Sequence, residues 1–416
     1  MMISSTPEPA EIGLRARTIR RRRGLSLDVA AGLAGISKSY LSRLENGQRQ
    51  FERRGLLDDL AAALGCSVVD LTGQPYLPPD RATADALATV PGIQLAVYDC
   101  TLHDVPDMLA RPITDLVTLA RQANAHCDET RYALAGREFG AVLSELHVHV
   151  ATGDTDTRRA ALAALVEACL AASGTVRTLG HAELAVATAR RGYDAARLLG
   201  DPGLTAFAAM QRAGALIRVG ARHRAATVLG DALVAVEPTA DPTATDTRPA
   251  QAAGMLHLSF AQLASREGRA GDADTHLEQA AELAQRTGER NDLNFHFGSA
   301  NVTAWSVSIA VELQRGPVAV EHTALDTPRL AAVLGSADRR AGLHFDLARG
   351  WAQAEGARDV EAIRHLDAAD RIAPQRIRND PIARDLVLML DRRARRRVWE
   401  LDSLRNRLGI GQVQSR

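Results

Sequence analysis

The sequence predicts an all-α protein in which a small N-terminal helical bundle precedes a long series of helical hairpins. Only 4% of the 416 residues are aromatic, although 46% are hydrophobic, and alanine and leucine recur throughout. Sheets depend more on β-branched and aromatic residues, so this composition favours helices. Beyond the first bundle, apolar stretches with helical spacing alternate with short breaks that contain glycine, proline or aspartate.

The first 73 residues are expected to form a five-helix bundle. Ser26 and Ser37 stand where helix N-caps are needed, and Gly24 is of the residue type that commonly ends a helix. The expected helices run from Ile12 to Gly24, from Leu27 to about Ala34, from Ser37 to Gly47, over 53–65 and over 67–73. The second and third, joined by a turn at Gly35, form a helix-turn-helix.

The third helix lies in the stretch GISKSYLSRLENGQR and has one apolar side. Leu41 and Leu44 are expected to face the core. The other side chains are expected to point outward, and they are Lys38, Ser39, Tyr40, Ser42 and Arg43. An exposed row of hydroxyls and cations at a helix tip suits contact with the bases and phosphates of a DNA duplex.

A resemblance to a known family of DNA-binding domains is carried by three stretches of the sequence. They are RARTIRRRRGLS, AGISKSYLSRLENG and LAAALGCSVVDL. Over residues 11–73 the chain closely resembles the XRE, or phage-repressor-like, helix-turn-helix domain. The resemblance implies a lambda-repressor-like fold that binds double-stranded DNA with its third helix in the major groove. It also implies a structural pair between Arg20 and Glu45. The family often begins its second helix with glutamine, where this chain has Leu27, so the operator preference of relatives does not carry over.

The expected DNA contacts fall into two groups. Base edges are expected to be read by Lys38, Ser39, Tyr40 and Arg43, because they lie near the start of the third helix. Phosphate contacts are expected at the helix ends, from Ser37, Gln48 and Arg49. Arg17 has two interpretations, a phosphate contact or a solvated surface cation.

A proline-rich polar stretch, GQPYLPPDRAT, predicts a domain boundary after the bundle. We expect a DNA-binding domain over 1–73, a linker and connecting helix over 74–110, and a helical repeat domain for sensing and dimerisation over 111–416.

Glycines spaced by 40 to 48 residues indicate the repeats. Small or apolar residues follow at offsets of five, nine and twelve after Gly180, Gly220 and Gly268. A looser copy follows Gly356, while Gly136 resembles the first such glycine and Gly316 a degenerate one. Each of these glycines is expected to form the tight turn between two paired helices. The pattern resembles the tetratricopeptide repeat, with units longer than its usual length of about 34 residues. About six helical pairs would stack into a superhelix with a concave wall, and the alternative is an irregular helical bundle.

The segment from Glu289 to Leu313 is unusually rich in amides and aromatics for this chain. As a helix it would place several of them near one face, where amides can bind a peptide backbone through donor and acceptor together. The candidate ligand-binding residues are Asn294, Phe297, Asn301 and Trp305. The alternative is that these side chains cross-link neighbouring helices.

The sequence offers no support for catalysis, a metal site or a cofactor. It contains no HExxH, GxSxG or GxxxxGK[ST] motif. His147 and His149 would lie on different faces of a helix, and the four cysteines are far apart. No signal peptide and no run of eighteen apolar residues occurs, so we expect a cytoplasmic protein that does not enter a membrane.

The net charge of zero conceals two basic ends. Residues 1–54 carry 11 basic and 5 acidic side chains, residues 371–416 carry 12 and 5, and the middle carries 27 and 40. The last expected helix, LMLDRRARRRVWELDSLRNRLG, carries Arg392 to Arg397 beside Trp399. It has three interpretations: a polar cap on the last repeat, a dimer interface, or a contact with DNA that flanks the operator.

Together these observations predict a transcriptional regulator that binds a two-fold operator as a homodimer and senses a peptide or small molecule in its repeat domain. The plan is similar to that of actinobacterial XRE regulators, and in architecture alone to peptide-sensing quorum regulators. The alternative is a protein-interaction adaptor with a vestigial helix-turn-helix. The operator, the effector and the sign of regulation do not follow from the sequence.

Overall fold

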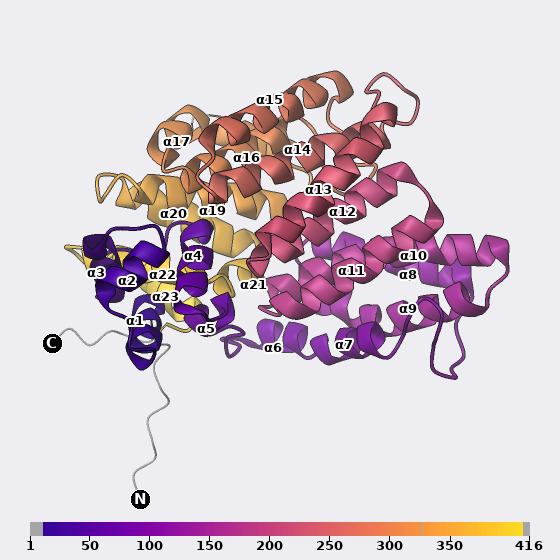
Figure 1. The fold of residues 1–416 in the computed structure, drawn as a ribbon, viewed down its shortest axis with the longest axis horizontal. Coiled ribbons are helices and arrows are strands. Elements are labelled where there is room, and N and C mark those ends of the chain that lie inside the picture. The colour runs from indigo at the N-terminus through magenta and orange to yellow at the C-terminus, as the bar shows by residue number, and fades with distance from the viewer. Residues whose placement is uncertain (1–10, 325, 411–416) are drawn as a thin grey trace, which may run out of the picture.

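The computed structural model describes residues 11–324 and 326–410. These residues form helices and connecting loops, with an isolated β-bridge between Arg290 and Phe297 (Figure 1). The all-α prediction is therefore confirmed.

The N-terminal bundle contains the five expected helices. They are α1 (Ile12–Arg22), α2 (Leu27–Leu33), α3 (Lys38–Glu45), α4 (Arg54–Leu64) and α5 (Val68–Thr72). Leu41, Leu60 and Phe51 are buried at its centre. Each predicted boundary lies within about two residues of the observed one, because the caps that set these boundaries are local features of the sequence.

The expected linker contains two helices that belong to the body of the protein. Helices α6 (Arg81–Leu87) and α7 (Val90–Tyr98) pack against α9 (Tyr132–Thr152). Ile93 and Val97 are buried in the same core as the first repeats. The segment 74–110 therefore holds one more helix than expected, and its two ends are loops.

Six helical pairs follow, in agreement with the predicted number. They are α8 (Ile113–Asp128) with α9, α10 (Thr155–Thr178) with α11 (Ala182–Leu199), α12 (Pro202–Arg218) with α13 (Arg222–Val236), α14 (Arg248–Arg266) with α15 (Ala270–Thr287), α16 (Ser299–Glu312) with α17 (Gly316–Ala324), and α19 (Ala337–Ala352) with α20 (Asp359–Ile372). Shorter elements complete the chain, namely η1 (Glu237–Thr239), α18 (Thr327–Val333), α21 (Pro374–Arg378), α22 (Pro381–Arg393) and α23 (Trp399–Arg407).

The repeat glycines form the turns between paired helices. Gly180, Gly220, Gly268 and Gly356 have φ between +73° and +101°, a backbone region that favours glycine. The prediction for Gly136 is wrong, because this residue lies inside α9. A Cβ there would come within 2.0 Å of the Thr89 hydroxyl, so Gly136 permits close packing instead of a turn. Gly316 begins α17 directly after its turn.

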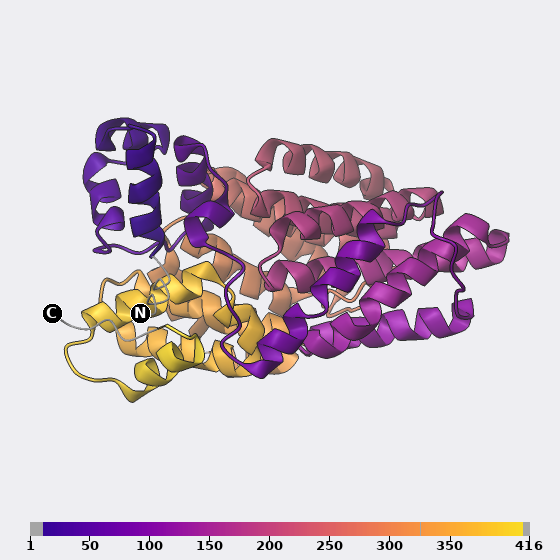
Figure 2. The ribbon, with the colours of Figure 1, turned by 90° about the horizontal axis from the view of Figure 1, so that it is seen from below.

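The N-terminal bundle packs against the C-terminal end of the chain. Phe51 and Glu11 contact Asp385 and Arg392 of α22, and Figures 1 and 2 show the bundle beside the C-terminal helices, with the repeats extending away. The basic C-terminal segment expected to be one helix is broken between α22 and α23, and its arginines 395–397 are exposed.

Helix α10 is long and apolar enough to cross a membrane by length and composition alone. Its most apolar window has a mean hydropathy of 1.4, although it contains no uninterrupted run of eighteen apolar residues. Within the structure 72% of that window is buried, against α8, α9 and α11. This burial is what a core helix of the repeat domain requires.

Two buried histidines, His147 and His257, and the half-buried His365 make the stability of this fold sensitive to acid. Burial lowers the pKa values of His147, His257 and His365 to about 4, against an ordinary value of 6.5. The unfolded chain therefore binds protons between pH 6.5 and 4 that the folded chain does not bind. By linkage, each such site lowers the free energy of unfolding by about 2 kcal/mol between pH 7.5 and pH 5.

We therefore expect thermal unfolding at pH 5 to occur well below its temperature at pH 7.5. His257→Gln is expected to reduce this difference, because one titrating site is lost. His322→Gln, at an exposed position on α17, serves as the control. Equal pH dependence of the His257 variant and the unchanged protein would contradict the assignment.

Candidate DNA-binding surface and ligand cavity

Helix α3 is held at the surface of the bundle by caps and a glycine turn. The backbone N–H of Val29 donates to Ser26 Oγ, and that of Tyr40 donates to Ser37 Oγ, each at 3.2 Å. Gly35 has a φ of +66° in the turn between α2 and α3. Both predicted caps are confirmed, and together they direct the first turn of α3 outward.

Arg20 and Glu45 form the structural pair that the family resemblance implied. Two guanidinium nitrogens of Arg20 donate to the two carboxylate oxygens of Glu45, at 2.6 and 2.7 Å. The hydrogen bonds with Glu45 raise the pKa of Arg20 above its usual value. Because Glu45 is buried, this pair fixes α3 against α1.

The expected DNA-contacting residues are mostly exposed. These exposed residues are Ser37, Lys38, Ser39, Arg43 and Gln48. Lys38 Nζ forms an ion pair with Asp28 at 2.7 Å, yet its side chain remains 59% exposed. Tyr40 and Ser42 are only half-exposed, so the expectation that they point fully outward is wrong. The Tyr40 ring packs against the bundle core, and burial raises its pKa.

Two of the expected phosphate contacts are engaged within the protein. Arg17 donates to the side-chain oxygen of Asn46 at 3.1 Å. Arg49 forms an ion pair with Glu355, in the turn after α19, at 2.6 Å. Arg49 therefore connects the flank of α3 to the repeat domain in this arrangement.

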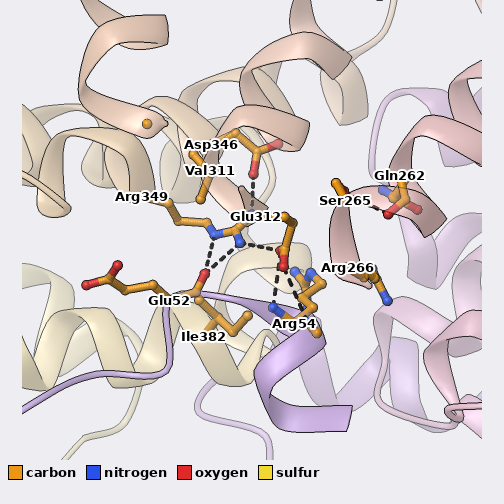
Figure 3. A network of polar contacts seen from close by, with 12 residues as sticks. Glu52, Arg54, Gln262, Ser265, Arg266, Val311, Glu312, Asp346, Arg349 and Ile382 are labelled. Atoms are coloured by element: carbon orange, nitrogen blue, oxygen red, sulfur yellow. Dashed lines mark hydrogen bonds and ion pairs between the residues drawn. The ribbon is translucent and has the colours of Figure 1, made fainter. Parts of the chain in front are cut away.

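A buried polar network joins the bundle to the repeats (Figure 3). Glu312, at the end of α16, accepts hydrogen bonds from the backbone N–H groups of Arg54 at 3.1 Å and Gly55 at 3.3 Å. Arg349 on α19 donates to Glu312 at 2.6 Å and to the Glu52 carbonyl at 2.6 Å. Burial raises the pKa of Glu312, but the charges of Arg349 and Arg266 outweigh it and hold this pKa below its usual value.

Further contacts surround this network. The backbone N–H of Phe51 donates to the buried Asp385 carboxylate at 2.7 Å, and burial raises the pKa of Asp385 to about 6. Arg222 donates to Asp59 at 2.8 Å, and Gln74 donates to the Asn379 carbonyl at 2.7 Å. The bundle and the proline-rich join are therefore both anchored to the repeat domain.

A cavity of about 170 Å³ lies along the inner wall of the repeats. Its wall comes from α10, α12, α14, α16 and α19, the first helices of five consecutive pairs, together with α21 and the Arg54 side chain of the bundle. A second cavity, of about 100 Å³, shares Arg177, Gln211 and Arg339 with the first. This position matches the predicted concave wall.

The candidate ligand residues occupy different places. Trp305 and Asn301 line the main cavity, whereas Asn294 lines the neighbouring one. Phe297 is only 1% exposed and packs against Gly254 in the core, so its assignment to a ligand site is wrong. The expected single helix is also wrong before Ser299, because Gly288 and Gly298 bound a loop in which Asn294 has a φ of +57°.

The arginines of this wall are functional candidates that the sequence interpretation missed. Arg177, Arg218 and Arg266 each stand two or three residues before a repeat glycine. This similar position in each repeat was a signal in the sequence, since equivalent positions of stacked repeats face the same wall. Phe295, also missed, lines both cavities and has Arg339 4.7 Å from its ring centroid.

The comparisons with known proteins identify the N-terminal bundle. Residues 11–72 match a family model described as a helix-turn-helix domain, so the helix-turn-helix domain expected there is confirmed. No curated protein matches the chain. Among solved structures, the chain is similar to Bacillus thuringiensis PlcR in complex with the peptide PapR7 and DNA. That match has 10% identity and a TM-score of 0.36, over 88% of this chain and 96% of that one.

Replacement of Glu312 is expected to loosen the bundle from the repeats. Glu312→Ala leaves Asp346 as the remaining carboxylate partner of the buried Arg349, and it removes the acceptor for two backbone N–H groups. Breaking such a buried pair costs about 3 to 5 kcal/mol in the free energy of unfolding. Chemical denaturation measures this loss, with Glu278→Ala on the exposed side of α15 as the control. Similar losses in both variants would contradict the proposed role of Glu312.

Proposed function

We propose that this protein is a transcriptional regulator that binds DNA as a homodimer and is controlled by a small molecule or peptide in the repeat cavity. The observation that carries the proposal is the exposed N-terminal turn of α3 in a helix-turn-helix bundle. Lys38, Ser39 and Arg43 present cations and a hydroxyl there, which can contact base edges in the major groove.

A homodimer follows from the small size of one reading surface. One helix offers few base contacts, and specific binding by helix-turn-helix proteins commonly joins two such helices on half-sites about one helical turn apart. The protein would act in the cytoplasm, where bacterial DNA is found, and by binding instead of by catalytic turnover.

Control by an effector is supported by the position of the cavity. Its wall combines repeat helices with Arg54, the first residue of α4 in the bundle. An effector in this place could alter how the bundle is held, provided that it binds the two arrangements unequally. The rival function, a protein-interaction adaptor, would leave the exposed tip of α3 without a ligand.

Arg43→Ala tests the DNA-binding proposal. If Arg43 reads a guanine, the variant should lose about 1 to 3 kcal/mol of affinity for the specific site. Arg159→Ala, at an exposed position on α10, removes the same charge far from α3 and should bind as the unchanged protein does. Selection of genomic fragments supplies the site, and a fluorescence titration at several salt concentrations measures the affinity. Absence of salt-dependent DNA binding would favour the adaptor.

A further inference from the structure

The repeat cavity is strongly basic. Seven arginines line it, namely Arg54, Arg177, Arg218, Arg266, Arg339, Arg349 and Arg376, whereas the acidic residues of its wall are Asp338 and Asp346. Four of the arginines have carboxylate partners. The pairs are Arg54 with Asp380, Arg349 with Glu312 and Asp346, Arg376 with Asp338, and Arg266 with Asp58.

Within the described part of the chain, the other three cavity arginines have no carboxylate partner of this kind. Among the described residues, no carboxylate lies within 4.0 Å of Arg177, Arg218 or Arg339. Arg339 lies instead over the rings of Phe295 and Trp305. The positive charge of Arg54, together with burial and Arg177, holds the pKa of Arg218 well below its usual value. Asp380 opposes this effect at Arg218, as Asp338 does at Arg177 and Arg339, yet burial and the neighbouring arginines together keep all three pKa values below their usual value. The cavity thus contains positive charges that are only partly compensated.

Like charges crowded in a partly buried cavity are unfavourable unless an anion joins them. Guanidinium groups bind carboxylate and phosphoryl oxygens through paired, charge-assisted hydrogen bonds. The same wall offers the neutral side chains of Gln211, Gln262 and Ser308, and the Trp305 ring. Such a lining suits an anionic group attached to a small organic body.

The side chain of Asn301 gives a second, independent indication that the cavity binds a ligand. This residue is fully buried and lines the cavity. Its Nδ2 donates to the Phe295 carbonyl at 3.0 Å, but its Oδ1 has no hydrogen-bond partner among the described residues. A buried acceptor without a donor is costly, so this oxygen would gain from a donor on an entering molecule.

We propose that the cavity binds a small organic anion whose carboxylate or phosphoryl group is held by Arg177, Arg218 and Arg339. This proposal rests on the proposed control by an effector and names the chemical class of that effector. The neighbouring cavity, lined by Asn294 and Tyr132, would accommodate part of the organic body.

The anion should also favour the docked arrangement of the bundle. Arg54 belongs to the bundle, and its charge opposes those of Arg177 and Arg218 across the cavity. An anion between these groups replaces repulsion with attraction, and this gain exists only while Arg54 lines the cavity. Such a ligand binds the docked state more tightly and therefore stabilises it.

Binding of inorganic phosphate and of citrate to the full-length protein tests the proposal. Calorimetry and the unfolding temperature are measured at constant ionic strength, adjusted with chloride. We expect at least one probe to bind and to raise the unfolding temperature. Arg177→Gln and Arg218→Gln should each weaken binding about tenfold, the factor for one charge-assisted hydrogen bond. Arg159→Gln, on the exposed start of α10, should bind as the unchanged protein does.

The probes distinguish the two sources of negative charge. Response to phosphate alone assigns a phosphoryl group, and response to citrate alone assigns a carboxylate. Failure of both probes, or equal binding by Arg218→Gln and the unchanged protein, would overturn the proposal.

The unfolding temperature of the variants without ligand distinguishes an arginine that binds the anion from one that stabilises the fold. Arg218→Gln should keep or raise the unfolding temperature, because it removes a repelled charge, whereas a structural arginine would lower it. Anion binding is measured without DNA, so it can succeed where DNA binding fails, and the reverse. The two proposals can therefore fail independently.

Discussion

The buried ion pair between Glu312 and Arg349 holds the N-terminal bundle on the repeats. The two side chains are 4% and 2% exposed, so desolvation opposes their burial. Glu312 offsets this cost because it also accepts two backbone N–H groups at the start of α4. Those groups carry the positive end of the helix dipole. Arg349 in turn donates to Asp346 and to a bundle carbonyl.

Because of this arrangement, a residue of the repeat domain completes the N-terminal cap of a helix in the bundle. The N-cap position of α4 is Arg53, whose side chain makes no capping hydrogen bond. Glu312, more than 250 residues away in sequence, supplies the missing acceptor. Helix α4 is therefore better capped when the bundle is docked, and a change that moves α16 or α19 reaches the DNA-binding bundle directly. Arg54 combines both effects, because its backbone is capped by Glu312 while its side chain lines the basic cavity.

The parts of this fold that the sequence predicted are governed by neighbouring residues. Ser26 and Ser37 cap helices through bonds to residues three positions ahead, and Gly220 and Gly268 turn the chain between paired helices. Gly136 misled the interpretation because its small size serves packing against Thr89, 47 positions earlier, and sequence spacing cannot separate that use from a turn.

The site was less predictable because its geometry depends on distant segments. Trp305 and Asn301 were recognised as unusual residues and do line the cavity. Phe297 belongs to the same stretch rich in amides and aromatics, but it lies in the core, because the loop before Ser299 directs it away from the cavity. Within the described residues, the cavity has more arginines than carboxylate partners for them, and this excess arises from the packing of five helices. The sequence alone does not show that Arg177 and Arg339 line the same cavity.

The exposure of α3 restricts how an effector could regulate DNA binding. Lys38 and Arg43 are exposed while the bundle is docked, so docking does not act by covering the reading surface. The nearby ion pair between Arg49 and Glu355 involves an exposed carboxylate, and surface pairs contribute about 0 to 1 kcal/mol. Such a pair is too weak to withhold the helix from DNA. If an effector controls DNA binding as proposed, it must therefore act on the orientation of the whole bundle, which depends on the buried contacts of α4. In the proposed dimer, that orientation would set the separation of the two α3 helices.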